Sequence, residues 1–305
     1  MLSLITHPAC LAHRNPDGHL ETPGRLSAVT RRLAEVVAAG NARWVEAPEV
    51  ERDDVLRVHA SAHVRRLEDL DRAGGGLLDP DTTMGPGSLE AARRAAGAAV
   101  LGAELALSGR GPAFCPVRPP GHHATPTRAM GFCLFNNAAV AAQAALARLG
   151  AERVLVVDWD VHHGNGTADA FRAEARVRYV SLHQWPWYPG TGAADDTGVG
   201  NLFHVPREPG LPRETYTADL LAAVDRAVER FEPSLIVFSA GFDALADDPL
   251  GGFTLEPEDF GALTLEVAAR APRAGLLSVL EGGYAPVRVA EAALRHAQAL
   301  ATLRD

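Results

Sequence analysis

Apolar side chains recur at intervals of three and four residues in several long segments of the chain. This spacing places them on one face of a helix, so each segment is predicted to be an amphipathic helix that packs against a core. The predicted helices cover residues 21–39, 88–107, 135–149, 213–230 and 255–271.

Short apolar runs rich in Val and Leu lie between these segments. They cover residues 114–117, 154–157, 177–182, 235–239 and 276–280. Runs of this length that alternate with helices indicate buried strands of a mostly parallel sheet with helices on both faces. No internal repeat, linker or change of composition divides the chain. We therefore predict a single α/β domain over residues 1–305, with three layers in the order α/β/α.

Glycine and proline gather directly after the predicted strands. They occur in the segments RPPGHHA, HHGNGT, PWYPGTG, AGFDALADDPLGG and EGGYAP. In open α/β sheets the ligand site lies outside the carboxyl ends of the strands. The polar residues of these loops are therefore expected to converge on one edge of the sheet.

A candidate metal site follows the strand at 154–157. Asp160 and His162 are two residues apart, so their side chains point to the same face and can share one zinc ion. Asp243, which follows the strand at 235–239, is the candidate third ligand, although a loop Asp more often caps a helix or forms a turn. Two acids and one imidazole leave a position open for water, which is typical of a catalytic zinc site.

His122 and His123 are adjacent in a turn that two prolines and a glycine precede. A lone histidine in such a loop is usually an ordinary hydrogen-bonding residue. Two adjacent imidazoles repel each other when both are charged, so their pKa values should separate. A neutral and a protonated histidine beside a metal-bound water would supply a base and an acid.

Three further residues could assist this chemistry. Asp158 lies two residues before Asp160 and could orient one histidine; the simpler alternative is that it only caps the strand end. Asn165 could orient the other histidine, more weakly because its amide oxygen carries no charge. Tyr284 follows two glycines that let the backbone approach the site. Its phenol could donate a hydrogen bond to an oxygen that becomes negative during a reaction. A Tyr that merely anchors a loop is the simpler alternative.

Composition narrows the possible functions. All 29 basic residues are Arg, which excludes Schiff-base and phosphate-loop lysines, and the net charge of -9 argues against nucleic acid or an anionic membrane as a partner. The three cysteines are too scattered for a CxxC zinc site and suit a reducing compartment. The first residues lack the pattern of a secretory signal, and no apolar run is long enough for a membrane span. We therefore expect a cytoplasmic protein.

Six segments in order resemble the zinc-dependent histone deacetylase superfamily, which includes acetylpolyamine amidohydrolases and acetoin-utilisation proteins. They are RPPGHHA, GFCLFNNAAVAA, VLVVDWDVHHGNGT, SLHQWPWYPGTG, SAGFDALADDPLGG and LEGGY. DWDVHHGNGT is more similar to the class II and bacterial branches than to class I. The resemblance runs from about His7 to Tyr284 and implies the fold that deacetylases share with arginase.

The resemblance also implies a role for each matching residue. Asp160, His162 and Asp243 would bind one zinc ion, His122 and His123 would form the acid–base pair, and Tyr284 would polarise the substrate carbonyl. Arg25 would lie by an internal channel at the foot of the site. Gly131, Phe132, Tyr188, Asp81 and Gly282 would contact the substrate. A structural potassium ion would be held by Asp158, Asp160, His162, Ser181 and Leu182.

The implied activity is hydrolysis of the amide of an acyl-lysine residue or of an acetylated polyamine or other small amine. Two alternatives stay open from the sequence. One is a binuclear manganese hydrolase like arginase, although Asn165 stands where a second carboxylate would be needed. The other is a protein that binds acyl-lysine or polyamine without turnover.

Overall fold

The main sheet consists of eight parallel strands in a computed structural model that describes residues 1–303. Their spatial order is β2-β1-β5-β10-β9-β6-β7-β8. The strands are β1 (Leu2–Thr6), β2 (Ala42–Glu46), β5 (Ala113–Cys115), β6 (Val154–Asp158), β7 (Val177–Gln184), β8 (Leu202–Arg207), β9 (Leu235–Ala240) and β10 (Gly275–Leu280). A separate antiparallel hairpin is formed by β3 (Gly76–Asp79) and β4 (Thr82–Met84).

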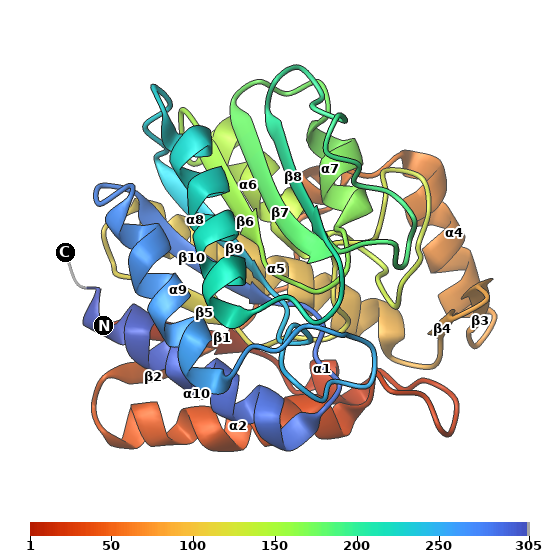
Figure 1. Cartoon of the computed structure of the whole chain (residues 1–305). Helices are drawn as coiled ribbons and strands as arrows, with labels where there is room; N and C mark the ends of the chain where they lie inside the picture. The colour runs from red at the N-terminus through yellow and green to blue at the C-terminus, as the bar shows by residue number, and fades with distance from the viewer. Residues whose placement is uncertain (304–305) are drawn as a thin grey trace.

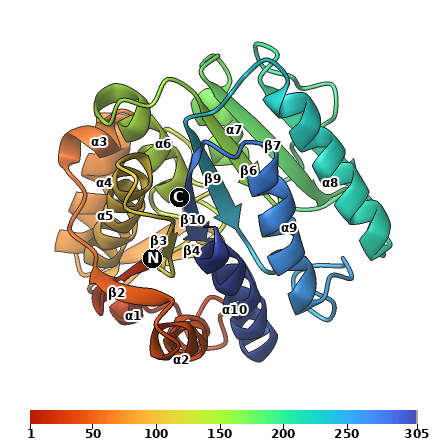
Figure 2. The same cartoon turned by 90° about the vertical axis from the view of Figure 1, so that its left-hand side faces the viewer.

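Helices cover both faces of this sheet, as Figures 1 and 2 show. α5 and α6 lie on one face, and α8, α9 and α10 lie on the other, with α2 packed against α10. The helices are α1 (Ala9–Ala12), α2 (Pro23–Ala38), α3 (Arg52–Leu56), α4 (Ser61–Arg72), α5 (Ser88–Leu107), α6 (Asn137–Arg148), α7 (Asn165–Phe171), α8 (Arg213–Val228), α9 (Pro257–Ala269) and α10 (Pro286–Thr302). The predicted three-layer α/β/α fold with a mostly parallel sheet is confirmed.

The central strands are covered on both faces, which explains their uninterrupted apolar sequences. Every residue of β6 and of β9 is buried. All five predicted strands and all five predicted helices are present, and α5 has the predicted bounds. The sequence prediction missed the edge strands β2 and β8, the strand β1 next to β2, and the hairpin of β3 and β4. It also missed the short helices α1, α3, α4 and α7 and the C-terminal helix α10.

The strand order brings the loops of distant segments together. β9 and β10 lie between β5 and β6, so the carboxyl ends of these four strands are neighbours at the centre of the sheet. Asp158 at the end of β6 is level with Ser239 of β9 and Ser181 of β7, and Ser239 is level with Val279 of β10. The loops that leave these strands therefore start from one edge at almost one height.

None of the helices in residues 1–303 has the length and apolar character needed to cross a membrane.

Candidate active site

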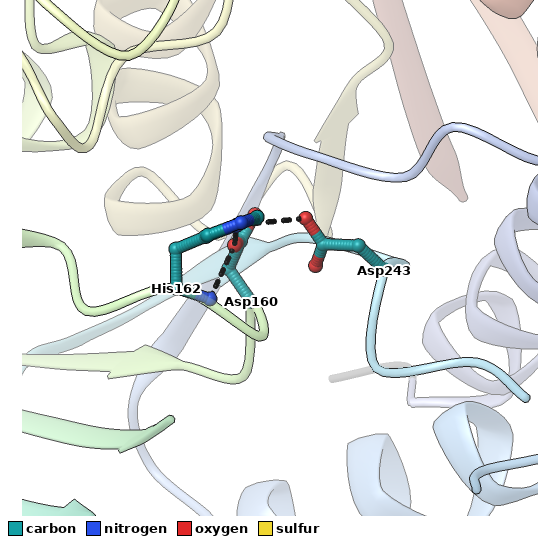
Figure 3. A group of neighbouring side chains, drawn as sticks. All are labelled: Asp160, His162 and Asp243. Carbon is teal, nitrogen blue, oxygen red and sulfur yellow. Dashed lines mark hydrogen bonds and ion pairs between the residues drawn. The ribbon is translucent and has the colours of Figure 1, made fainter. Parts of the chain in front are cut away.

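The loops at the carboxyl edge of the sheet bring the predicted metal ligands together. Asp160 and His162 follow β6, and Asp243 follows β9. One ligand atom from each lies within 4.8 Å of the others. His162 Nδ1 is 2.9 Å from Asp160 Oδ1 and 3.2 Å from Asp243 Oδ2, and the three side chains point at one another in Figure 3. Both carboxylates are fully buried, and His162 is only 7% exposed.

The hydrogen bonds around these carboxylates leave one oxygen atom, Asp243 Oδ2, without a donor. Asp160 Oδ2 accepts from the backbone N–H of Gly282 at 2.8 Å, and Asp243 Oδ1 accepts from that of Val161 at 2.8 Å. Asp243 Oδ2 is buried and accepts no hydrogen bond from residues 1–303. A buried oxygen of this kind is costly unless something else binds it.

The negative charges of Asp160 and Asp243 also favour binding of a cation. Burial opposes protonation of His162, but its contacts with Asp160 and Asp243 outweigh burial and raise its pKa to about 10. Burial and the charge of Asp160 raise the pKa of Asp243 to about 7. A divalent cation at this position would balance both carboxylates and replace the proton on His162. Two carboxylate oxygens and one imidazole nitrogen form a donor set that suits zinc.

Two glycines let the backbone pack directly against the carboxylates. A Cβ atom at Gly282 would lie 2.6 Å from Asp160 Oδ2 and would overlap Asp243 Oδ2, and one at Gly241 would overlap Asp160. Gly282, predicted from the resemblance to contact substrate, thus lies against the metal-ligand candidates. Only glycine fits at these two positions without moving the carboxylates.

The adjacent histidines lie beside this group, with ring centroids 4.1 Å apart. His122 Nδ1 is 3.0 Å from Asp158 Oδ2, and His123 Nδ1 is 2.8 Å from Asn165 Oδ1. Burial disfavours the charged form of His122, but Asp160 and Asp158 outweigh it and raise its pKa well above the usual value. Burial and the neighbouring positive charge of His122 lower the pKa of His123 well below that value. The expected separation of the two pKa values is therefore found.

Asp158 has a second partner that the sequence did not indicate. The hydroxyl of Tyr179 donates to Asp158 Oδ2 at 2.8 Å, and the backbone N–H of Asp160 donates to Asp158 Oδ1 at 3.1 Å. Tyr179 lies on β7 and is fully buried. A Cβ atom at Gly164 would overlap both the Asp158 carboxylate and the Tyr179 hydroxyl, so this junction needs glycine there.

Tyr284 follows β10 and is fixed from two sides. Its backbone N–H donates to Asp248 Oδ2 at 2.7 Å. The guanidinium of Arg25 lies 4.7 Å from the centroid of the Tyr284 ring. It also donates to the backbone oxygen of Gly283 and, at 2.8 Å, to the backbone oxygen of Glu281. Arg25 is buried and comes from α2, so this helix supports the Tyr284 loop. Asp248 and Glu281 were not identified from the sequence.

Aromatic residues border the group of histidines. The ring of Tyr188 lies edge-on to His123 with centroids 5.1 Å apart, and Phe132 lies edge-on to Tyr284 at 5.8 Å. Gly131 and Phe132 both have positive φ angles, of 55° and 68°. The backbone N–H of Phe132 donates to the hydroxyl of Thr82 at 2.9 Å, which places Asp81, the neighbour of Thr82, close by. The residues predicted to contact substrate thus surround the same site.

Comparison with known proteins gives consistent matches. The family model described as "Histone deacetylase domain" matches residues 19–300. The chain is 42% identical over 281 residues to the "Histone deacetylase-like amidohydrolase" of Pseudomonas aeruginosa, covering 89% of this chain and 74% of that protein. It is 40% identical over 291 residues to a "Probable deacetylase" of Methanothermobacter thermautotrophicus, covering 93% and 86%. The solved structure titled "Crystal Structure of HDA15 HD domain" superposes with a TM-score of 0.92 at 36% identity, covering 98% of this chain and 88% of that chain.

Replacing Gly282 with Ala should disrupt the metal-ligand group. The added Cβ overlaps the Asp243 carboxylate and crowds Asp160, so one of them must move. We expect zinc affinity, measured by competition with a chromophoric chelator, to fall at least about tenfold, in line with the effect of disturbing residues around metal ligands. Far-UV circular dichroism should stay unchanged. Native zinc affinity in Gly282→Ala would contradict this geometry.

Proposed function

The chain belongs to the histone deacetylase family, and from this premise we propose that it is a zinc-dependent amidohydrolase that removes acetyl or longer acyl groups from amines. The proposed substrates are acyl-lysine residues in peptides or proteins, or acetylated polyamines and other small amines. The observation that carries the proposal is the buried group of Asp160, His162 and Asp243 beside the paired histidines. The hydrolysis would produce a carboxylic acid and a free amine.

One zinc ion per chain would be held by Asp160, His162 and Asp243. When bound, zinc would polarise the acyl carbonyl and lower the pKa of the attacking water molecule. A structural potassium ion is proposed to be held by Asp158, Asp160, His162, Ser181 and Leu182. Asp158 and Ser181 lie level with each other on the neighbouring strands β6 and β7.

The paired histidines would carry the protons. His123 has a lowered pKa and is neutral at pH 7, so it can accept a proton from water as the water oxygen attacks the acyl carbon. His122 is held cationic by Asp160 and Asp158, so the pair also holds a proton for the leaving amine as the C–N bond breaks. Asn165 and Asp158 would keep the two rings oriented.

Tyr284 would stabilise the charge that develops on the acyl oxygen. None of residues 1–303 forms a hydrogen bond with its hydroxyl, which is therefore free to donate to substrate. Burial raises the pKa of Tyr284 well above its usual value, so the phenol keeps its proton. A donor aimed at a developing oxyanion typically contributes a large part of the rate enhancement.

The remaining proposed contacts concern substrate binding. The aromatic rings of Phe132 and Tyr188 would flank the aliphatic part of an acyl-lysine or polyamine chain, with Gly131 and Gly282 as close backbone neighbours. Asp81, which belongs to none of the ion pairs formed within residues 1–303, would accept a hydrogen bond from the substrate.

Turnover and metal content together test this function. We expect the native protein to hydrolyse at least one substrate in a panel of acetyl-, propionyl- and crotonyl-lysine peptides, acetylputrescine and acetylspermidine. Dialysis against a chelator should abolish turnover, and one equivalent of zinc should restore it. Absence of turnover across the panel would favour binding without catalysis. Two manganese ions per chain would favour an arginase-like reaction.

Replacing Tyr284 with Phe should lower kcat by about 10²–10³-fold, because one oxyanion donor is lost. Zinc content should not change. Tyr216→Phe is the matched control, since it removes the hydroxyl of another buried tyrosine that donates only to the backbone oxygen of Trp159; its kcat should be close to that of the native protein. Full activity in Tyr284→Phe would refute the oxyanion role.

A further inference from the structure

Glu281 is a buried carboxylate next to the active site. It has no role in the proposed mechanism. It directly follows β10, three residues before Tyr284, and is 1% exposed. Its side chain reaches the turn that carries the paired histidines. Oε2 accepts the backbone N–H groups of Gly121 at 2.6 Å and of His122 at 3.1 Å, and Oε1 accepts the hydroxyl of Ser239 at 3.0 Å.

These bonds join segments that are 160 residues apart in the chain. The backbone of Glu281 is itself fixed, because its N–H donates to the oxygen of Ala240 and its oxygen accepts from Arg25. Its side chain therefore connects a rigid strand end to the histidine turn. The next residues along the chain lead from the same strand end to Tyr284.

The backbone of the histidine turn lies outside the sheet, so its buried N–H groups need acceptors from other segments. The N–H groups of Gly121 and His122 are buried, and the Glu281 carboxylate is their acceptor within residues 1–303. Gly121 is also tightly enclosed, since a Cβ atom there would lie 2.5 Å from the backbone nitrogen of Asn137. A shift of the turn would move both imidazoles relative to the metal ligands and to Tyr284.

We propose that Glu281 is a positioning residue that sets the distance between the paired histidines and the Tyr284 loop. This inference rests on the proposed deacetylase function, because it assigns the histidines and the phenol to one reaction. Glu281 acts through the backbone of Gly121 and His122 and does not touch the substrate. Its essential property is the reach of the one side-chain oxygen that accepts both backbone N–H groups.

The alternative is that the charge of Glu281 matters, through its field at His122. Burial raises the pKa of Glu281 to about 7, so the carboxyl group is partly neutral near that pH. Two substitutions separate the explanations. Glu281→Gln keeps the length, can accept both backbone N–H groups and can donate to Ser239, but has no charge. Glu281→Asp keeps the charge but is one methylene too short to reach the turn from the same backbone position.

Steady-state kinetics of both variants test the inference. A positioning role predicts that Glu281→Asp lowers kcat about 10–100-fold with KM within about threefold, because small displacements of reacting groups cost rates of this size. Glu281→Gln should stay within about threefold of native kcat. The opposite ranking, with Gln impaired and Asp active, would overturn positioning in favour of charge. Native kcat in both variants would also overturn it.

Hydrogen exchange gives a readout that does not depend on activity. We expect the amides of residues 119–124, followed by mass spectrometry of native-state exchange, to exchange at least about tenfold faster in Glu281→Asp and at the native rate in Glu281→Gln. Glu256→Asp and Glu256→Gln are the matched controls, because the side chain of Glu256 is 37% exposed, caps α9 and pairs with Arg288. They should change neither kinetics nor exchange at 119–124.

The two levels of proposal can fail separately. If the native protein turns over no acylated amine, the proposed function fails, whatever the exchange data show. If the native protein is active but Glu281→Asp shows native kcat and native exchange at 119–124, only the positioning role fails. Should Glu281→Asp not fold, Glu281→Gln decides alone: a loss of more than about tenfold in kcat rejects positioning by hydrogen bonds, and native kcat with native exchange supports it.

Discussion

Two carboxylates buried side by side at the edge of a sheet need positive charge close to them. Asp160 and Asp243 are fully buried and lie against one imidazole, in a position where desolvation makes uncompensated negative charge costly. The surrounding residues accommodate these two carboxylates in three ways. Backbone N–H groups donate to some of the carboxylate oxygens, glycines allow the backbone to come close, and one buried oxygen is left for a cation.

Rigid elements hold the groups around this centre. Asp158 is fixed by Tyr179 and in turn orients His122, while Asn165 orients His123. Around the Tyr284 loop, buried Glu21 forms ion pairs with Arg25 and Arg118. Arg25 then supports the backbone on either side of Gly282. Strand ends and buried side chains thus give the site the small positional tolerance that metal binding and catalysis require.

The sequence predicted the parts of this site that lie next to strong local signals. Asp160, His162 and Asp243 follow continuous apolar strands, and the pair His122–His123 follows two prolines and a glycine, so their convergence could be expected from the parallel fold. Tyr179 and Glu281 were missed because their partners come from distant segments. A tyrosine inside a buried strand and a glutamate before two glycines have no local pattern that reveals these contacts. The missed helix α10 begins with Pro286, a start signal that could have found it.

One divalent metal ion is proposed to bind among Asp160, His162 and Asp243. Anomalous X-ray scattering, measured on either side of the zinc absorption edge from crystals of protein purified without chelators, tests it most directly. We expect one zinc peak, bonded to a carboxylate oxygen of each aspartate and to His162 Nδ1. The absence of any peak among these three residues, or a pair of metal peaks there, would contradict it.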